Sequence, residues 1–474
     1  MIYRPYDYQR TATQWIIDKP YCCLFLDMGL GKSVITLTAI REMIDSCDMT
    51  KALVVAPKKV AETTWTTEAA KWDHLKGLRV SKVMGTEKQR IEALATDADV
   101  YVIGRDNYVW LTGHYGGRLP FDVLVIDELT SFKSAKSQRF KAMRITRPSF
   151  KRVIGLTGTP APNGMIDLWA QMYCVDGGAR LGKSITRYRD THFNQQRWNN
   201  IVVRCDIKKG HEEVIRGSIS DICLSMQAKD YLQLPDLICH TVPVELSPKT
   251  LAAYNAFERE KVLEFKNDDK KDILANSAAG LMNKLAQYAN GAIYDAEHNV
   301  HDIHGEKVEK LAEIVEGANG SGVLVFYQYK HDVPRIQQRL KGYRVEVYEG
   351  EQQLKDWNEG KIDVLLAHPA STAYGLNMQQ GGHYIVWFGT GWDLELFQQA
   401  NARLYRQGQR MPVTVYKLIA SHTVDERANA ALSSKSSKQQ SLLDSLNYLI
   451  RKYDGEGQGL QQVNTHDAVA TATA

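Results

Sequence analysis

Hydrophobic residues in the first third of the chain occur in short, nearly continuous runs that alternate with helical stretches. Each run has four or five residues and ends in a polar loop; the runs are Cys22–Leu26, Ala52–Ala56, Val100–Ile103, Val123–Ile126 and Val153–Leu156. Such runs are typical of parallel strands that helices cover on both faces. We therefore predict an α/β fold whose functional side chains gather at the carboxyl ends of the strands.

The same pattern returns in the second half of the chain, after a polar stretch without regular periodicity. The second series of runs is Val323–Phe326, Val345–Tyr348, Val364–Ala367, Tyr384–Phe388 and Val413–Leu418. This repetition predicts two α/β lobes, at residues 1–176 and 235–423, with residues 177–234 as an insertion or linker between them.

The remaining segments are predicted from their local pattern. Residues from about 248 to 291 have a helical pattern and are expected to protrude from the second lobe. Residues 424–453 are expected to form one or two terminal helices. Residues 454–474 are rich in Gly, Gln, Ala and Thr, which predicts a disordered tail.

Length and composition limit the class of protein. A chain of 474 residues is too long for one core. It has no apolar run of roughly eighteen residues and no signal peptide, so we expect no membrane segment. Its seven cysteines include no Cys-x-x-Cys pair. This usage argues against a disulfide framework or a zinc site and favours the cytoplasm.

The net charge is only +4, but basic residues cluster between Ser131 and Arg152. This stretch has no acidic residue and eight basic ones, namely Lys133, Lys136, Arg139, Lys141, Arg144, Arg147, Lys151 and Arg152. Their spacing suits one side of a helix, either as a solvated face or as a surface that contacts the phosphates of a nucleic acid.

A loop with two glycines, Asp27-Met28-Gly29-Leu30-Gly31-Lys32-Ser33, joins the first predicted strand to a helical stretch. The glycines let successive N–H groups face one anion, Lys32 supplies charge for the outer phosphates, and the Ser33 hydroxyl can bind Mg²⁺. Leu26 stands where the consensus of such loops has its first glycine, so a plain turn that caps a helix is the alternative. We favour a loop that binds a nucleoside triphosphate.

Two further strand ends carry candidate chemistry. Asp127 and Glu128 follow the fourth run. Asp127 is suited to hold Mg²⁺, and Glu128 to orient and deprotonate a water molecule, although an exposed loop start is the alternative. Thr157 and Thr159 flank a glycine after the fifth run, where they either sense the γ-phosphate or form a simple turn.

In the second lobe, Arg403 and Arg406 are three residues apart and share one face of a predicted helix. Guanidinium groups that reach a triphosphate from the second lobe can accelerate phosphoryl transfer by about 10³- to 10⁵-fold. The alternative is a pair of surface arginines bound to Glu395 or Asp393.

Taken in order, these motifs resemble those of the Swi/Snf-type DNA translocases of helicase superfamily two, in their compact bacterial or bacteriophage form. The resemblance extends from about Arg4 to about Leu446. It is carried by Arg4-Pro5-Tyr6-Asp7-Tyr8-Gln9, the loop around Lys32, Trp65-x-x-Glu68, Leu156 to Asn163, Ser371 to Asn377, and Gln399 to Gln409. One departure is Leu129-Thr130 after the acidic pair, where the family usually has alanine and histidine.

The resemblance implies two tandem RecA-like lobes with parallel sheets, small helical insertions and a C-terminal helical brace. It implies ATP and Mg²⁺ as ligands between the lobes. By position in the family's motifs, it assigns adenine binding to Gln9, ATP binding to Leu30 and Gly375, coupling to Gln399, and nucleic-acid contacts to Lys58, Gln328, Ser371 and Thr372.

The implied function is a DNA-dependent ATPase that moves along double-stranded DNA without sequence preference. We expect a monomer with replication or recombination proteins as further partners, in the host cytoplasm if a phage encodes it. A strand-separating helicase on single-stranded DNA or RNA is the nearest alternative. An ATP-gated DNA clamp with weak hydrolysis is the third, and Thr130 alone supports it.

Overall fold

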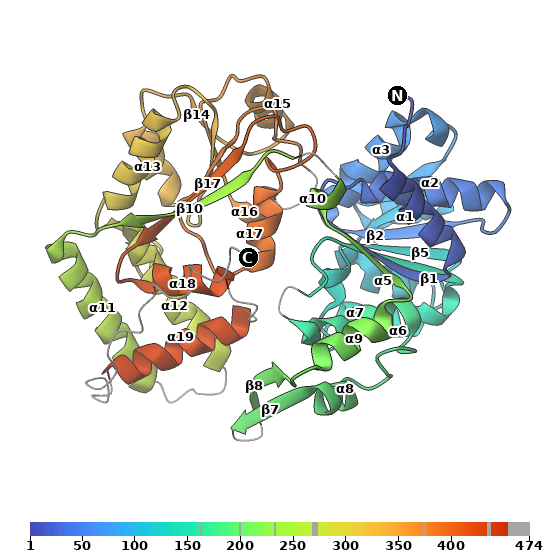
Figure 1. Ribbon diagram of the computed structural model, residues 1–474, viewed down its shortest axis with the longest axis horizontal. Helices are drawn as coiled ribbons and strands as arrows, with labels where there is room; N and C mark the ends of the chain where they lie inside the picture. Colours follow the sequence, from blue (N-terminus) through green and yellow to red (C-terminus); the bar gives the residue numbers. More distant parts are fainter. Residues whose placement is uncertain are drawn as a thin grey trace.

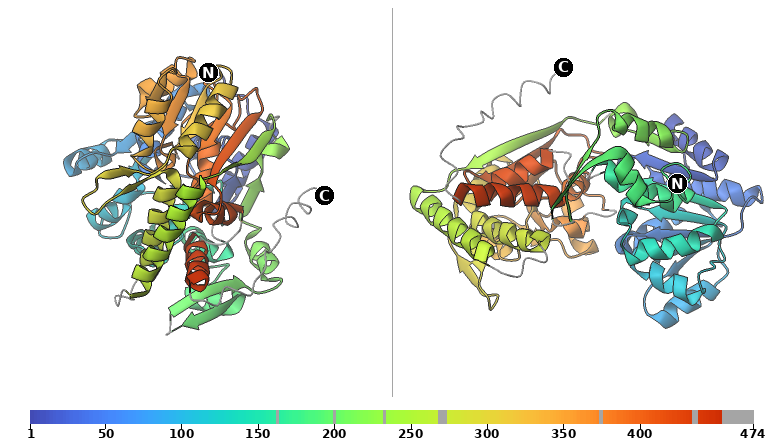
Figure 2. Two further views of the ribbon diagram at one scale, coloured as in Figure 1. Left: turned by 90° about the vertical axis from the view of Figure 1, so that its left-hand side faces the viewer. Right: turned by 90° about the horizontal axis from the view of Figure 1, so that it is seen from below.

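The computed structural model contains two lobes, each built on one large parallel sheet, and Figures 1 and 2 show the lobes side by side. The structure describes residues 1–161, 164–198, 201–231, 234–267, 274–372, 376–433 and 438–453. The tail predicted at residues 454–474 lies outside the described residues. No helix in the described part is both long and apolar enough to cross a membrane.

The first lobe contains a seven-stranded parallel sheet in the order β3-β4-β2-β5-β6-β1-β9. Its strands are β1 (Tyr21–Leu26), β2 (Ala52–Ala56), β3 (Val80–Val83), β4 (Val100–Gly104), β5 (Val123–Asp127), β6 (Arg152–Thr157) and β9 (Cys223–Met226). All five runs predicted in this lobe are confirmed as strands.

Helices cover both faces of the first sheet. One face packs against α1 (Asp7–Asp18), α2 (Lys32–Asp45) and α3 (Trp65–Lys71), and the other against α5 (Tyr108–His114), α6 (Gln138–Thr146) and α7 (Leu168–Asp176). Successive residues of β1 therefore enter opposite cores, Leu24 on the first side and Phe25 on the second. This two-sided burial explains why the strand sequences are continuously apolar.

The second lobe contains a six-stranded parallel sheet in the order β10-β17-β16-β13-β15-β14. Its strands are β10 (Leu237–Val244), β13 (Val323–Phe326), β14 (Val345–Val347), β15 (Val364–Ala367), β16 (Tyr384–Trp387) and β17 (Val413–Ala420). Helices α13 (Glu306–Gly317) and α14 (Asp332–Arg339) pack on one face, and α15 (Glu351–Asn358) and α17 (Leu394–Asn401) on the other. All five runs predicted here are confirmed.

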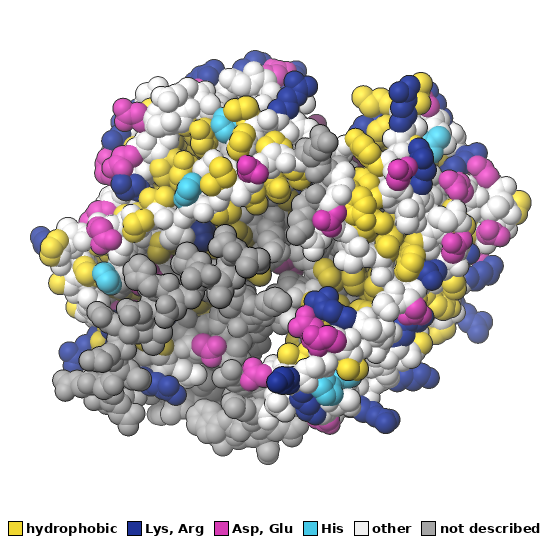
Figure 3. All heavy atoms as spheres, in the orientation of Figure 1, with side chains coloured by type: hydrophobic (Ala, Val, Ile, Leu, Met, Phe, Trp, Pro, Cys, Tyr) yellow, Lys and Arg dark blue, Asp and Glu magenta, His cyan; other side chains and the backbone are white. Residues whose placement is uncertain are grey.

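The hydrophobic pattern missed three strands at the edges of the two large sheets, although it identified the edge strand β14. β3, β9 and β10 each lie at the edge of a sheet, where polar or exposed positions such as Lys82 and Ser225 interrupt the apolar run. On β10, Leu237 and Ile238 are exposed, and Figure 3 shows hydrophobic side chains gathered over this part of the second lobe.

Residues 177–234 are more regular than expected. They contain α8 (Ile185–His192), an antiparallel hairpin of β7 (Phe193–Trp198) and β8 (Ile201–Ile207), α9 (His211–Ile219), β9 and α10 (Ala228–Tyr231). The expected lack of regular structure is therefore wrong for this part of the chain, and its role as an insertion or linker between the lobes stays a prediction. Because β9 pairs with β1, the first sheet extends past residue 176. The exact lobe boundaries stay a prediction.

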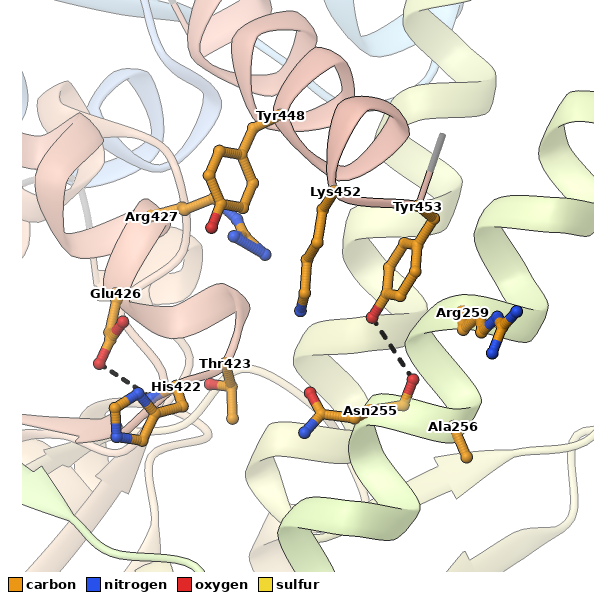
Figure 4. Close-up of a pocket in the computed structure, with 10 residues that line it drawn as sticks. All are labelled: Asn255, Ala256, Arg259, His422, Thr423, Glu426, Arg427, Tyr448, Lys452 and Tyr453. Atoms are coloured by element: carbon orange, nitrogen blue, oxygen red, sulfur yellow. Dashed lines mark hydrogen bonds between the residues drawn. The ribbon is translucent and has the colours of Figure 1, made fainter. Parts of the chain in front are cut away.

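Four helices pack together next to the second sheet (Figure 1), namely α11 (Pro248–Asn267), α12 (Leu274–Asn290), α18 (Val424–Ser433) and α19 (Lys438–Tyr453). They account for the predicted helical patterns at 248–291 and 424–453. Ion pairs to buried carboxylates hold these helices: Lys307 of the neighbouring α13 binds Asp425 of α18, and Glu258 of α11 binds Arg427 of α18 and Lys452 of α19. A cavity of about 550 Å³ lies between α11, α18 and α19, and Figure 4 shows the residues that line it.

The described part of the chain also contains shorter elements. They are α4 (Glu87–Ala95), α16 (Pro369–Thr372), a 3₁₀ helix at Leu129–Phe132, and a hairpin of β11 (Ala292–Tyr294) and β12 (Val300–Asp302).

The packing of α19 on the second lobe can be tested at Leu446, which is 1% exposed. We expect Leu446→Ala to lower the free energy of unfolding by about 2–5 kcal/mol, because truncation leaves a cavity. Asn447→Ala alters the next, exposed residue and should change that free energy by no more than about 0.5 kcal/mol. Urea denaturation measures both values, and equal effects would contradict this packing.

Candidate active site

Three neighbouring strands of the first sheet end at the same edge, and a predicted motif follows or ends each one. β5, β6 and β1 are adjacent and parallel. The loop with two glycines follows β1, Asp127 and Glu128 stand at the end of β5, and Thr157 ends β6. Parallel pairing therefore gathers residues that are far apart in the chain.

The loop after β1 turns through glycines with positive φ angles, 86° at Gly29 and 81° at Gly31, a region that other residues occupy at a cost. Gln9 lies against this turn, because a β-carbon at Gly31 would be 2.8 Å from Gln9 Nε2. The Leu30 side chain is fully buried in the core, so only its backbone can face a ligand. Ser33 lies in the first turn of α2, where backbone N–H groups lack helical acceptors.

Lys32 shares its surroundings with the two acidic residues. Its ammonium group donates to the carbonyl oxygens of Leu26 at 2.7 Å and Asp27 at 3.3 Å. Burial lowers the pKa of Lys32, while the carboxylates of Glu128 and Asp127 oppose this shift. Burial raises the pKa of both carboxyl groups, and Lys32 opposes that shift in turn. The three charged groups therefore form one mostly buried cluster.

Asp127 and Glu128 have different hydrogen-bond partners. Trp65 Nε1 donates to Asp127 Oδ2 at 2.9 Å. Glu128 Oε1 accepts from Thr157 Oγ1 at 2.9 Å and is 3.0 Å from Thr130 Oγ1. Glu128 has a φ of 62°, a left-handed conformation that costs a non-glycine residue about 1–3 kcal/mol. Thr157 holds its carboxylate in a defined direction in spite of this cost, and the Thr130 hydroxyl lies within hydrogen-bond distance of the same oxygen.

The predicted arginines of the second lobe lie beside the glycine loop of the first. Arg403 Nη2 is 3.5 Å from Met28 Sδ, and a β-carbon at Gly29 would be 3.6 Å from Arg406 Cβ. Arg403 is buried, so the alternative of a surface arginine is wrong at this position. Arg406 Nη1 donates to the Leu376 carbonyl at 2.8 Å, and burial lowers the pKa of Arg406.

The residues predicted to couple the lobes have partners within each lobe. The Thr159 N–H donates to Thr157 Oγ1 at 3.1 Å, and the buried Thr159 hydroxyl has no hydrogen-bond partner among the described residues. In α17, Gln399 Nε2 donates to Glu395 Oε1 at 3.2 Å, and the Gln399 carbonyl accepts from Arg403 Nε at 2.9 Å.

The predicted nucleic-acid contacts lie at the carboxyl ends of strands in both lobes. Gln328 follows β13, and Ser371 and Thr372 belong to α16, which follows the adjacent strand β15. Lys58 follows β2, and its side chain is 73% exposed. The next residue, Lys59, donates to the Ser371 carbonyl at 3.0 Å, which joins this part of the first lobe to α16. Thr372 is buried, and the contacts of all four residues with nucleic acid stay predictions.

The predicted basic helix face is not found, and the prediction for Gly375 cannot be followed in the structure. The basic residues between Ser131 and Arg152 do not form one helix face, because α6 carries only Arg139, Lys141 and Arg144. Arg147 donates to the Val175 carbonyl, and Arg152 to the carbonyls of Ile16 and Ile17. These two arginines therefore stabilise the first lobe itself. Gly375, predicted at the ATP site, lies outside the described residues.

Sequence analysis missed two sets of contacts at the site. One is the hydrogen bond from Trp65 to Asp127, which joins residues from different helices and strands. The other centres on Glu395 of α17, whose Oε1 is 3.0 Å from Thr130 Oγ1 and whose Oε2 is 3.2 Å from Lys133 Nζ. Two signals in the sequence pointed to this region, namely threonine where the family usually has histidine, and Glu395 as an alternative partner of the arginines, but neither predicted this contact.

Comparisons with known proteins agree with the two-lobe architecture. The family model described as the SNF2-related domain matches residues 8–291, and the helicase conserved C-terminal domain matches residues 306–408. Protein p41 of Acyrthosiphon pisum secondary endosymbiont phage 1 is 36% identical over 463 residues, which cover 94% of this chain and 99% of p41.

Two further likenesses are more distant. An uncharacterized ATP-dependent helicase of Mycoplasma genitalium is 25% identical over 89% of this chain, but the match covers only 40% of that protein. The helicase domain of Pyrococcus furiosus Hef is 16% identical with a TM-score of 0.51, over 91% of this chain and 98% of that chain. The last likeness concerns the fold alone, and the predicted class of two tandem RecA-like lobes is confirmed.

The hydrogen bond that holds Asp127 can be tested by Trp65→Phe, which keeps most of the buried ring and removes the donor. We expect the free energy of unfolding to fall by about 1–3 kcal/mol, because a mostly buried carboxylate loses a partner. Trp110→Phe is the matched control, since Trp110 donates to Glu87 at an exposed site. Thermal or urea denaturation measures both, and a loss no larger than the control's would contradict this role.

Proposed function

Since this chain belongs to the SNF2-related family, we propose that it is a motor that couples ATP hydrolysis to movement along double-stranded DNA. The two matched domains indicate an enzyme that hydrolyses ATP. The proposal adds the binding site, the residues that act there and the duplex substrate.

In the proposed nucleotide site, the phosphates lie against the backbone N–H groups from Gly29 to Ser33, at the positive end of α2. Lys32 provides charge for the outer phosphates, and Gln9 binds the adenine. The contact of Gln9 with the turn at Gly31 supports this assignment. The Ser33 hydroxyl and the Asp127 carboxylate are hard oxygen donors of the kind that Mg²⁺ prefers, and the ion when bound would neutralise phosphate charge.

Glu128 is the proposed group that orients and deprotonates the attacking water. Its carboxylate is held by Thr157 and lies beside Lys32, which supports a fixed position for it. Arg403 and Arg406 would stabilise the negative charge that develops on the transferred phosphoryl group. Thr157, Thr159 and Gln399 would communicate the state of the nucleotide between the lobes.

One observation carries this proposal. Arg403 of the second lobe contacts Met28 in the glycine loop of the first, and the backbone at Gln407 approaches the same loop at Gly29. A nucleotide at that loop would therefore be bordered by both lobes. Catalysis would require both lobes together, so hydrolysis and lobe movement would be one coupled process.

Double-stranded DNA is the nucleic acid along which we propose that the motor moves, because the motifs resemble those of DNA translocases. Lys58, Gln328, Ser371 and Thr372 are the proposed contacts, and the link between Lys59 and Ser371 supports a surface that continues across both lobes. Contacts to phosphates carry no base information, so binding should tolerate any sequence and weaken with salt.

The decisive measurement is the ATPase rate with duplex DNA, single-stranded DNA, RNA or no nucleic acid. We expect duplex DNA to stimulate the wild type most, and Glu128→Gln to lose at least about 100-fold in kcat, the scale of a positioned acid or base. Stimulation by single strands or RNA alone would favour a strand-separating helicase. Equal rates in wild type and Glu128→Gln would favour an ATP-gated clamp.

The DNA contact of Lys58 has its own test. Replacement by alanine should weaken binding to unrelated duplexes equally and reduce the slope of log affinity against log salt concentration by about one, because one phosphate contact is lost. Lys88→Ala is the control, since Lys88 is exposed on α4. Fluorescence anisotropy at several salt concentrations gives both slopes, and identical slopes would exclude Lys58 from the contact.

A further inference from the structure

A single hydroxyl group lies between two carboxylates that belong to different lobes. Thr130 Oγ1 is 3.0 Å from Glu128 Oε1 in its own lobe and 3.0 Å from Glu395 Oε1 in α17 of the second lobe. Thr130 is 2% exposed, so water does not compete freely for these contacts. The acidic residue proposed for catalysis is thus one hydroxyl away from the second lobe.

The hydroxyl has one hydrogen atom, and ionised carboxylates only accept hydrogen bonds. Thr130 can therefore donate to Glu128 or to Glu395, but not to both at once. With the lobes in contact both acceptors are within reach. If the lobes separate, Glu395 moves away with α17, and Glu128 is the acceptor that remains.

Glu395 is built into the contact between the lobes by further partners. Its Oε2 pairs with Lys133 Nζ at 3.2 Å, and its Oε1 accepts from Gln399 Nε2 at 3.2 Å. Burial raises the pKa of Glu395, and the Lys133 ammonium opposes this shift. The Gln399 carbonyl then accepts from Arg403 Nε, which links Glu395 to the arginine beside the glycine loop.

We propose that Glu395 is a positioning residue for ATP hydrolysis: it docks α17 on Thr130 and Lys133, and so brings Arg403 to the loop while drawing the Thr130 hydrogen away from Glu128. This inference rests on the proposed function. Docking leaves Glu128 Oε1 with one donor fewer, and that oxygen is then open to a water molecule. The hydroxyl thus links lobe contact to the state of the catalytic carboxylate.

The test is a double-mutant cycle on kcat and KM for ATP with saturating duplex DNA. Thr130→Val and Glu395→Ala should each lower kcat about tenfold, the scale of one hydrogen bond to a charged group, and change KM less than about twofold. The double variant should lie within about twofold of the worse single variant, because both remove the same link. Thr130→Ser keeps the hydroxyl and should retain kcat.

Matched controls are Glu316→Ala, which removes an exposed carboxylate on α13, and Lys88→Met on α4 as the counterpart of Lys133→Met. Controls should match the wild type, whereas Lys133→Met should lower kcat. The inference is overturned if Glu395→Ala behaves like Glu316→Ala, or if the effects of Thr130→Val and Glu395→Ala simply multiply.

A second readout does not depend on catalysis. Cys47 in the first lobe and Cys239 in the second are exposed and can carry a donor and an acceptor dye once Cys205 and Cys223 are replaced by serine. Energy transfer should fall in Glu395→Ala and stay unchanged in Glu316→Ala. Unchanged transfer in Glu395→Ala would overturn the docking role. The wild type could prove inactive as an ATPase while Glu395→Ala still lowers the energy transfer. That result would contradict the proposed function and leave the docking role supported.

Discussion

The site depends on three charges that share one mostly buried place at the edge of the first sheet. Removing Lys32, Asp127 or Glu128 from water alone would be costly, and each charge offsets part of the cost for the others. The parallel order β5-β6-β1 is what brings them together. Donors from outside the cluster, at Trp65 and Thr157, satisfy the carboxylates further.

One of the contacts between the lobes comes from the segment that directly follows the acidic cluster. The 3₁₀ helix at Leu129–Phe132 follows Glu128 directly, and it carries Thr130 toward α17. On the other side, α17 joins Glu395 to Arg403 through Gln399. A shift of α17 would therefore move its contacts on both sides of the proposed nucleotide site. Contact between the lobes and hydrolysis could then be coupled through these few neighbouring residues.

The central strands and the glycine loop were predictable because their signals are local. A strand such as β2 is buried on both faces, so five consecutive apolar residues identify it. The edge strand β9 carries no such pattern, because its Ser225 is exposed, and it was missed. Contacts like Trp65 to Asp127 were also beyond reach, since a helix residue and a strand end meet only through the packing of the whole lobe.

Thr130 stands where the family usually has histidine, and only the structure shows which residue it contacts. In the sequence it suggests a weakened coupling, because a short hydroxyl replaces a longer imidazole. In the fold, Glu395 spans the remaining distance from the second lobe and Lys133 balances its charge. The Glu395 carboxylate is therefore the acceptor that α17 presents to the Thr130 hydroxyl, and the role of Thr130 in the fold follows from this contact and not from its own side chain alone.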